Sequence, residues 1–103
     1  MNRGDVYDVD WPGAGRHPAV IVTRQVAIPL LSSVTVAFVT STIRDLPTEI
    51  PLGPEQGLDH PCVANCDNLL TVPKPALVHH RGALGPTELD RLRDALRIAL
   101  ELD

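Results

Sequence analysis

The sequence predicts a mainly β fold with one helix at its C-terminal end. Short runs of β-branched and aliphatic residues recur between Gly4 and His80, each bounded by proline, glycine or polar residues. Helical apolar spacing appears only after Gly85. The 103 residues include 10 prolines, which keeps the strands short. Because open sheet edges promote aggregation, we expect the small sheet to curl and to close or partly close into a barrel.

Three strands are expected in the first half of the chain. Residues 4–10 alternate between apolar and polar side chains, as a half-buried strand does, and Pro12, Gly13 and Gly15 then form a loop. Residues 19–23 are a β-branched run that can be buried on both faces, with Pro18 at its first position. Residues 34–42 form the clearest strand of the sequence.

The second half is expected to hold shorter strands and the helix. Pro29 excludes a regular helix through 25–33. Pro86 suits the first helical position, and Glu88 is an acid in the first turn. The expected strands are 49–52, 61–65 and 76–80, with connections at 43–48, 53–61 and 69–75. The apolar stripe of the helix comprises Leu89, Leu92, Leu96 and Ala99.

Composition and length favour one globular domain spanning 1–103. The hydrophobic fraction of 44% is too high for a disordered segment. No apolar run approaches the roughly 20 residues that a membrane-spanning helix needs. The first residues show no signal peptide, so we expect a cytoplasmic protein with no membrane contact.

The two cysteines are expected to be small, semi-buried free thiols. Cys62 and Cys66 fall in one predicted strand, where four steps span about 13 Å, whereas a disulfide requires Cα atoms within about 7 Å. His60, His79 and His80 could form a metal site with the two cysteines, but free thiols are the favoured interpretation and no metal is expected.

The net charge of −4 disfavours a protein that coats nucleic acid through bulk electrostatics. Five acids and three arginines lie from Glu88 onward, so half of the net negative charge lies at the C-terminal end of the chain. Six basic residues remain for a local phosphate-binding patch, namely Arg3, Arg16, Arg24, Arg44, Lys74 and Arg81.

Five segments occur in the order and spacing of a known family. They are Arg3-Gly4-Asp5-Val6-Tyr7, the loop and aliphatic strand around Pro18-Ala19-Val20-Ile21-Val22, the strand ending at Thr40, the stretch from Cys66 to Lys74, and Leu84-Gly85-Pro86 before the helix. Together they resemble the MazF/PemK family of toxin endoribonucleases over nearly the full length.

The resemblance implies a small SH3-like (CcdB/MazF/PemK-type) barrel that forms a homodimer and is inhibited by a cognate antitoxin. It implies sequence-specific cleavage of single-stranded RNA without metal or other cofactor. The 2′-hydroxyl attacks its own phosphate and leaves a 2′,3′-cyclic phosphate and a 5′-hydroxyl, which inhibits translation and growth. The RNA can be mRNA, tRNA or rRNA.

The expected catalytic residues are Arg16, His17, Thr40 and Asp67. The family places an arginine immediately before the proline, whereas here His17 occupies that position and Arg16 precedes it. Arginine stays protonated and is a difficult base, but histidine titrates near neutrality. One of the two should stabilise charge and the other should move the proton. Thr40 matches the family's strand-end threonine, and Asp67 lies where some members place a carboxylate base.

The expected RNA-binding residues are Trp11, Arg24, Ser41, Arg44 and Asn68, with Trp11 able to stack on a base. The catalytic roles have structural alternatives. Arg16 can be a surface residue with His17 capping the strand, and Thr40 can be present only because threonine favours β structure. Leu70 replaces an arginine of the family before Thr71. This replacement and that of the arginine before Pro18 leave open a toxin-like binding module that has lost activity. A CcdB-like gyrase poison would share the barrel, but its action depends on an aromatic-rich C-terminal end, and this chain ends in Glu101-Leu102-Asp103.

Overall fold

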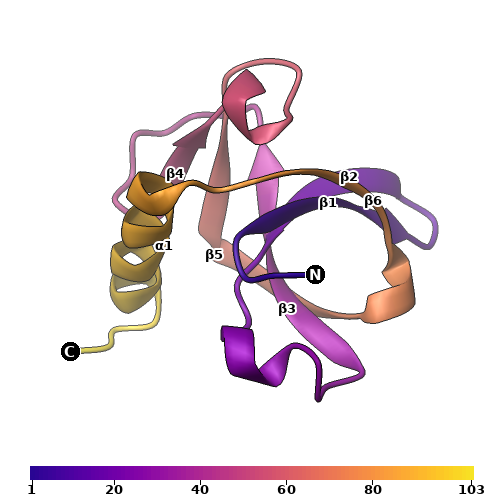
Figure 1. The fold of residues 1–103 in the computed structure, drawn as a ribbon. Coiled ribbons are helices and arrows are strands. Elements are labelled where there is room, and N and C mark those ends of the chain that lie inside the picture. The colour runs from indigo at the N-terminus through magenta and orange to yellow at the C-terminus, as the bar shows by residue number, and fades with distance from the viewer.

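The computed structural model describes all 103 residues as a curled antiparallel sheet of six strands with one helix against its outer side (Figure 1). The order of the strands in the sheet is β4-β5-β3-β2-β1-β6. Their bounds, with those of the helix, are β1 Asp5–Trp11, β2 Gly15–Ile21, β3 Ser33–Thr40, β4 Glu49–Leu52, β5 Cys62–Pro73, β6 Leu77–Ala83 and α1 Pro86–Ala99. The predicted fold class, a small barrel-like sheet with a C-terminal helix, is confirmed.

Two apolar cores fill the two sides of the sheet. Ala19 and Ile21 of β2 point into one core, inside the curl, and Val20 between them points into the other, where Leu92 and Ala95 of α1 pack. All three β2 residues are fully buried. The predicted burial on both faces holds for residues 19–21, because helix and curl each cover one face. Val22 and Thr23 lie beyond the end of β2 and are only half-buried.

The curl is closed by a contact that is not a strand pairing. The edge strands β4 and β6 do not pair with each other. The end of β6 instead lies against a short 3-10 helix, η2 Pro54–Gln56, and the residues after it. Gly57 and Gly82 have no side chains there, and a Cβ added to either would overlap the other segment's backbone. We call this contact the glycine seam.

The β5 strand differs from the prediction. Residues 61–65 were expected to form one short strand and 69–75 a connection, but β5 is continuous from Cys62 to Pro73. Its first part pairs with β4 and its later part with β3. The register with β3 shifts between Ala37 and Val39, whose partners are Leu69 and Ala64. Residues 65–68 therefore have no partner on β3, and the strand bulges there without ending.

The expected loop after β1 is a tight hairpin turn. The amide of Ala14 donates to the carbonyl of Trp11 over 3.0 Å. Pro12 and Gly13, with φ of +82° at Gly13, occupy the two central positions as in a type II turn. The second strand consequently starts at Gly15 rather than at Pro18, and it includes both Arg16 and His17.

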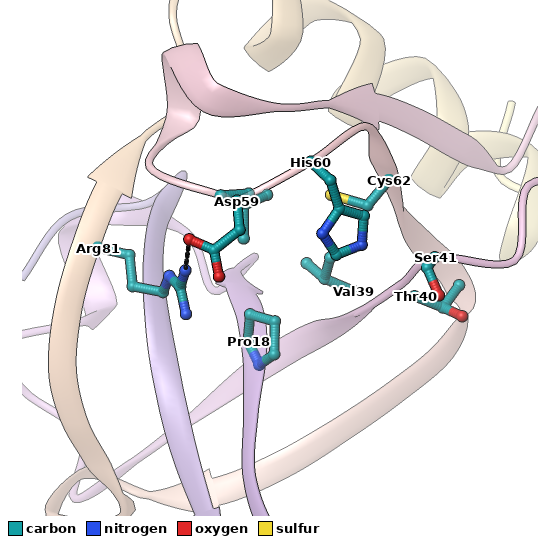
Figure 2. Close-up of a pocket in the computed structure, with 9 residues that line it drawn as sticks. Pro18, Val39, Thr40, Ser41, Asp59, His60, Cys62 and Arg81 are labelled. Carbon is teal, nitrogen blue, oxygen red and sulfur yellow. Dashed lines mark ion pairs between the residues drawn. The ribbon is translucent and has the colours of Figure 1, made fainter.

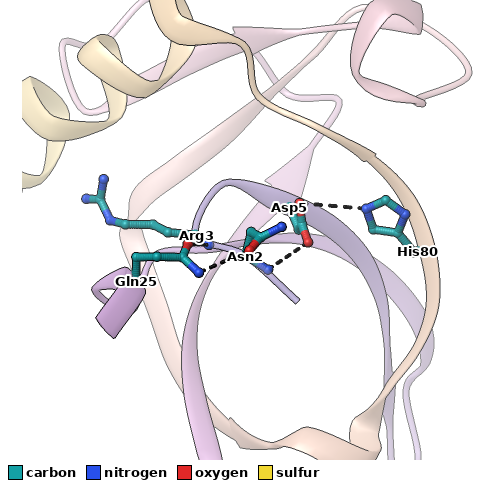
Figure 3. A network of polar contacts seen from close by, with 5 residues as sticks. All are labelled: Asn2, Arg3, Asp5, Gln25 and His80. Atoms are coloured by element: carbon teal, nitrogen blue, oxygen red, sulfur yellow. Dashed lines mark hydrogen bonds and ion pairs between the residues drawn. The ribbon is translucent and has the colours of Figure 1, made fainter. Parts of the chain in front are cut away.

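The N-terminal motif Arg3-Gly4-Asp5 is structural (Figure 3). The Asp5 carboxylate accepts a hydrogen bond from the amide of Asn2 over 2.8 Å and lies 3.7 Å from the His80 imidazole. The Gln25 side chain accepts from the amide of Arg3 and donates to Asn2. Arg3 Nε donates to the carbonyl of Val22. These contacts fix the start of the chain, as Figure 3 shows.

The helix and the cysteines agree with the sequence analysis. The helix begins at Pro86, and the Glu88 carboxylate accepts from the amide of Gly85 over 2.9 Å. Cys62 and Cys66 are free thiols on β5, although both are fully buried rather than semi-buried. The chain contains no helix of the length and apolarity required to span a membrane.

Candidate active site

A cavity of about 250 Å³ opens beside the glycine seam (Figure 2). We call it the Arg81 cavity. Its floor and walls come from four strands and from the connection between η2 and β5. The lining residues are Pro18, Val39, Thr40, Ser41, Leu58, Asp59, His60, Cys62 and Arg81.

Arg81 is held in this cavity by three partners. Its Nη1 donates to the Asp8 carboxylate over 3.2 Å, and its Nε donates to the carbonyl of Gly57 over 3.0 Å. Its Nη2 lies 3.3 Å from the exposed Asp59 carboxylate. The hydrogen bond with Asp8 raises the pKa of Arg81, so this guanidinium stays charged and cannot move a proton.

A second hollow of about 410 Å³ lies on the other side of Val39, which lines both depressions. We call it the Trp11 hollow. Its rim combines aromatic rings with one imidazole and one amide, a lining suited to a nucleobase. The lining residues are Trp11, Ala14, His17, Phe38, Val39, Asn68 and Leu70.

His17 is the only titratable group of the Trp11 hollow. Its Nε2 lies 2.8 Å from the carbonyl oxygen of Ala14. A carbonyl only accepts, so Nε2 must carry the proton of this hydrogen bond. In the neutral ring Nδ1 is then an unprotonated acceptor. The hairpin turn that presents Ala14 therefore selects the tautomer in which Nδ1 can act as a base.

The structure separates the predicted site residues into groups. Trp11, His17 and Asn68 line the Trp11 hollow, and Thr40 and Ser41 line the Arg81 cavity. Arg16 is exposed next to His17 but lines neither depression, as expected of neighbours in an extended strand.

Three further predicted residues lie apart from both depressions. The Asp67 carboxylate accepts a hydrogen bond from the Thr48 hydroxyl over 2.6 Å. Arg24 is exposed at the start of the 3-10 turn Gln25–Ala27, and Arg44 is exposed in the connection before β4. The structure does not bring these three side chains to the hollow that contains His17.

Half of the basic residues considered for a phosphate patch are already engaged. Arg3 donates to the carbonyl of Val22, Lys74 to the carbonyl of Ile28, and Arg81 to Asp8 and Gly57. Burial lowers the pKa of Arg3, helped by the charge of Arg93. The prediction that these three side chains are available for a phosphate patch was wrong.

His60 and Asp59 were not recognised as site residues from the sequence. His60 had been considered only as a metal ligand, and Asp59 belonged to an expected surface loop. The structure places both on the Arg81 cavity beside Thr40. No local signal marks them, because the seam that folds residues 53–61 over β2 and β3 is a long-range contact. No three His, Cys, Asp or Glu side chains are grouped as a metal site would require.

Comparison with known proteins agrees with this architecture. Residues 2–100 match the family described as the PemK-like, MazF-like toxin of type II toxin–antitoxin systems. Endoribonuclease MazF3 of Mycobacterium tuberculosis is 41% identical over 87 residues, 84% of either chain. Probable endoribonuclease MazF5 of the same species is 32% identical over 96% of this chain and 92% of its own.

Two solved structures share the fold. The Mycobacterium tuberculosis toxin MazF-mt6 superposes with a TM-score of 0.88 at 35% identity, covering 96% of this chain and 98% of its own. An endoribonuclease in complex with its cognate antitoxin, from a mycobacterial species, gives 0.89 at 32% identity, covering 100% and 97%. Fold and site thus define a small barrel toxin. The chain belongs to the PemK-like, MazF-like toxin family.

Proposed function

We propose that this toxin is a metal-independent endoribonuclease that cleaves single-stranded RNA at short sequences. A 2′-hydroxyl attacks the adjacent phosphate, and the products carry a 2′,3′-cyclic phosphate and a 5′-hydroxyl. Relatives named as endoribonucleases support the activity. The chemistry requires a base near the 2′-oxygen, positive charge near the phosphate and an acid for the departing 5′-oxygen.

The observation that carries the proposal is the hydrogen bond between His17 Nε2 and the carbonyl of Ala14. It leaves Nδ1 free to accept the proton of the 2′-hydroxyl. His17 is exposed within the Trp11 hollow, so a nucleotide can reach it. We assign the base to His17 rather than to Asp67, because the Asp67 carboxylate is occupied by Thr48 and lines neither depression.

The remaining roles follow from position. Arg16 is an exposed cation one residue from the base, and because its side chain lines neither depression we assign it the attraction of the RNA backbone beside the reacting phosphate. Thr40 and Ser41 offer hydroxyl donors from the other side of Val39. Trp11 and Asn68 give the nucleotide that carries the 2′-hydroxyl a stacking surface and an amide to bind. Arg24 and Arg44 attract the more distant RNA backbone.

The biological setting is inferred from the family. A relative of this chain is solved in complex with its cognate antitoxin, and we infer that this toxin too is neutralised by an antitoxin protein. We also propose that it forms a homodimer and acts in the cytoplasm, where cleaved RNA stops translation and growth.

The test is RNA cleavage in the presence of EDTA. The new 5′ ends are mapped, and their direct labelling by a kinase without prior phosphatase treatment reports 5′-hydroxyls. Loss of a general base reduces the rate about 10²–10⁴-fold, so His17→Ala is expected to lose at least about 100-fold, and Arg16→Ala is expected to lose activity as well.

His79→Ala is the matched control, because His79 is exposed on β6 and lines neither depression. It should cleave like the unmodified protein. RNA that stays intact under all conditions would refute the enzyme and favour a toxin-like module that only binds. Cleavage that disappears with EDTA would refute the metal-independent mechanism.

A further inference from the structure

The Trp11 hollow and the Arg81 cavity meet at Val39. Val39 lines both of them, and the chain passes from His17 in the Trp11 hollow to Pro18 in the Arg81 cavity. If His17 accepts the proton of the 2′-hydroxyl, as proposed above, the scissile phosphate lies over this ridge. The leaving nucleoside, with its 5′-oxygen, then enters the Arg81 cavity.

An acid for the 5′-oxygen must therefore come from the lining of the Arg81 cavity, which holds four titratable groups. Arg81 is held by Asp8, which raises its pKa further. The Cys62 thiol is buried, and burial raises its pKa. The Asp59 carboxylate lies 3.3 Å from Arg81 Nη2 and is engaged as the acceptor of that ion pair.

His60 is the fourth group, and it alone combines access with suitable chemistry. It is exposed and makes no hydrogen bond or ion pair within the chain. Figure 2 shows its ring pointing into the cavity between Asp59 on one side and Thr40 and Ser41 on the other. An imidazolium is an acid near neutral pH and is the usual proton donor at such sites.

We propose that His60 is the general acid that protonates the departing 5′-oxygen, opposite His17 as the base. His17 Nδ1 takes the proton of the 2′-hydroxyl as the bond from the 2′-oxygen to phosphorus forms. The bond from phosphorus to the 5′-oxygen breaks, and that oxygen takes a proton from His60. The products are the cyclic phosphate and the 5′-hydroxyl. Solvent then removes the proton from His17 and returns one to His60.

The surroundings of His60 allow this role. The charged or titratable groups that face it are Asp59 from its own connection, Cys62 from β5 and Arg81 from β6. The strands β2 and β3 and the residue after β3 contribute Pro18, Val39, Thr40 and Ser41, which do not titrate near neutrality. Because His17 must be neutral and His60 protonated, the rate should follow a bell-shaped pH profile whose alkaline limb reports the acid.

A substrate whose leaving group needs no acid tests the assignment. The cleavage site is first mapped on RNA, and the 5′-oxygen at that site is then replaced by sulfur, which departs as a thiolate. His60→Gln is expected to cleave the ordinary oligonucleotide about 10²–10³-fold more slowly than the unmodified protein. It should cleave the 5′-thio oligonucleotide within about threefold of the unmodified protein and lose the alkaline limb of the pH profile.

Three comparisons make the outcome decisive. His17→Gln should remain slow on both substrates, since sulfur does not replace a base, and His79→Gln should be normal on both. An equal defect of His60→Gln on both substrates, or no defect on either, would overturn the assignment of the acid. If the unmodified protein cleaves neither substrate, the proposed function itself fails, and this is seen before any variant is made.

Discussion

Arg81 binds Asp8, Asp59 and the carbonyl of Gly57. Replacing Arg81 should lower the stability of the fold far more than replacing its exposed partner Asp59. The perturbation is Arg81→Gln, with Asp59→Asn as the matched control. Arg81 Nη1 donates over 3.2 Å to Asp8, whose side chain is 13% exposed, while the side chain of Asp59, 3.3 Å from Nη2, is 87% exposed. The two carboxylates thus differ in solvation but bind the same guanidinium.

The magnitude follows from that difference. A hydrogen bond to a charged group contributes about 1.5–3 kcal/mol, and its loss leaves Asp8 poorly solvated and unpaired. An exposed ion pair contributes about 0–1 kcal/mol. We expect Arg81→Gln to lower the free energy of unfolding by about 2–3 kcal/mol and Asp59→Asn to lower it by less than about 0.5 kcal/mol. For a chain of this size the first change lowers Tm by about 10–20 °C.

Urea unfolding followed by circular dichroism measures both variants. Protomer concentration is held fixed, because the stability of a dimer depends on it. A double variant, Asp8→Asn with Arg81→Gln, should be less destabilised than the sum of its single variants. Similar losses for Arg81→Gln and Asp59→Asn, or additive losses in the double variant, would refute the view that Asp8 is the important partner.

Two further changes test the seam and the buried thiol. Gly82→Ala adds a Cβ that overlaps the carbonyl of Gln56 and should lower the free energy of unfolding by about 3 kcal/mol. In the control Gly53→Ala the added Cβ meets no other atom, and the free energy of unfolding should change by less than about 0.5 kcal/mol. Equal losses for the two variants in chemical denaturation would contradict the seam. Burial, followed by the charge of Asp67, raises the pKa of Cys66 to about 11, above its ordinary 9.0. The folded state therefore keeps a proton that the unfolded chain loses, and this stability is present below pH 9 and lost as the pH rises through 11. The loss should reach about 2–3 kcal/mol, and Cys66→Ala should remove that loss from the change in stability between pH 9 and 11. An unchanged loss in the variant would show that the thiol is not responsible.

The sequence was sufficient where a local pattern determines the structure. The helix from Pro86 and the strand around Val36 follow from apolar periodicity, a first-turn proline and β-branched residues. The continuity of β5 could not be predicted, because Asp67 and Asn68 resemble a break. They are exposed on a bulge that exists only because β5 pairs with β4 at one end and with β3 at the other.

The candidate site was predictable in part for the same reason. His17 and Thr40 lie on predicted strands and match the pattern of the family. The Arg81 cavity depends on pairs that are far apart in sequence, such as Arg81 with Asp8. Nothing local to His60 indicates that its connection folds over Pro18. The tautomer of His17 likewise depends on the carbonyl direction of Ala14, which the turn sets and composition does not.

The glycine seam closes the curled sheet without any pairing between its two edge strands. No backbone hydrogen bond joins Gly57 to Gly82. The two ends of the sheet are instead held together by close backbone contact and by the hydrogen bond of the Arg81 guanidinium to Gly57. The segment 53–61, which forms one side of the seam, also carries Asp59 and His60. The exposed residues of this segment after Leu58 can therefore change without altering the register of any strand pair. The pairing of the strands and the shape of the Arg81 cavity are therefore determined in part by different residues, so the cavity can vary while the sheet stays the same.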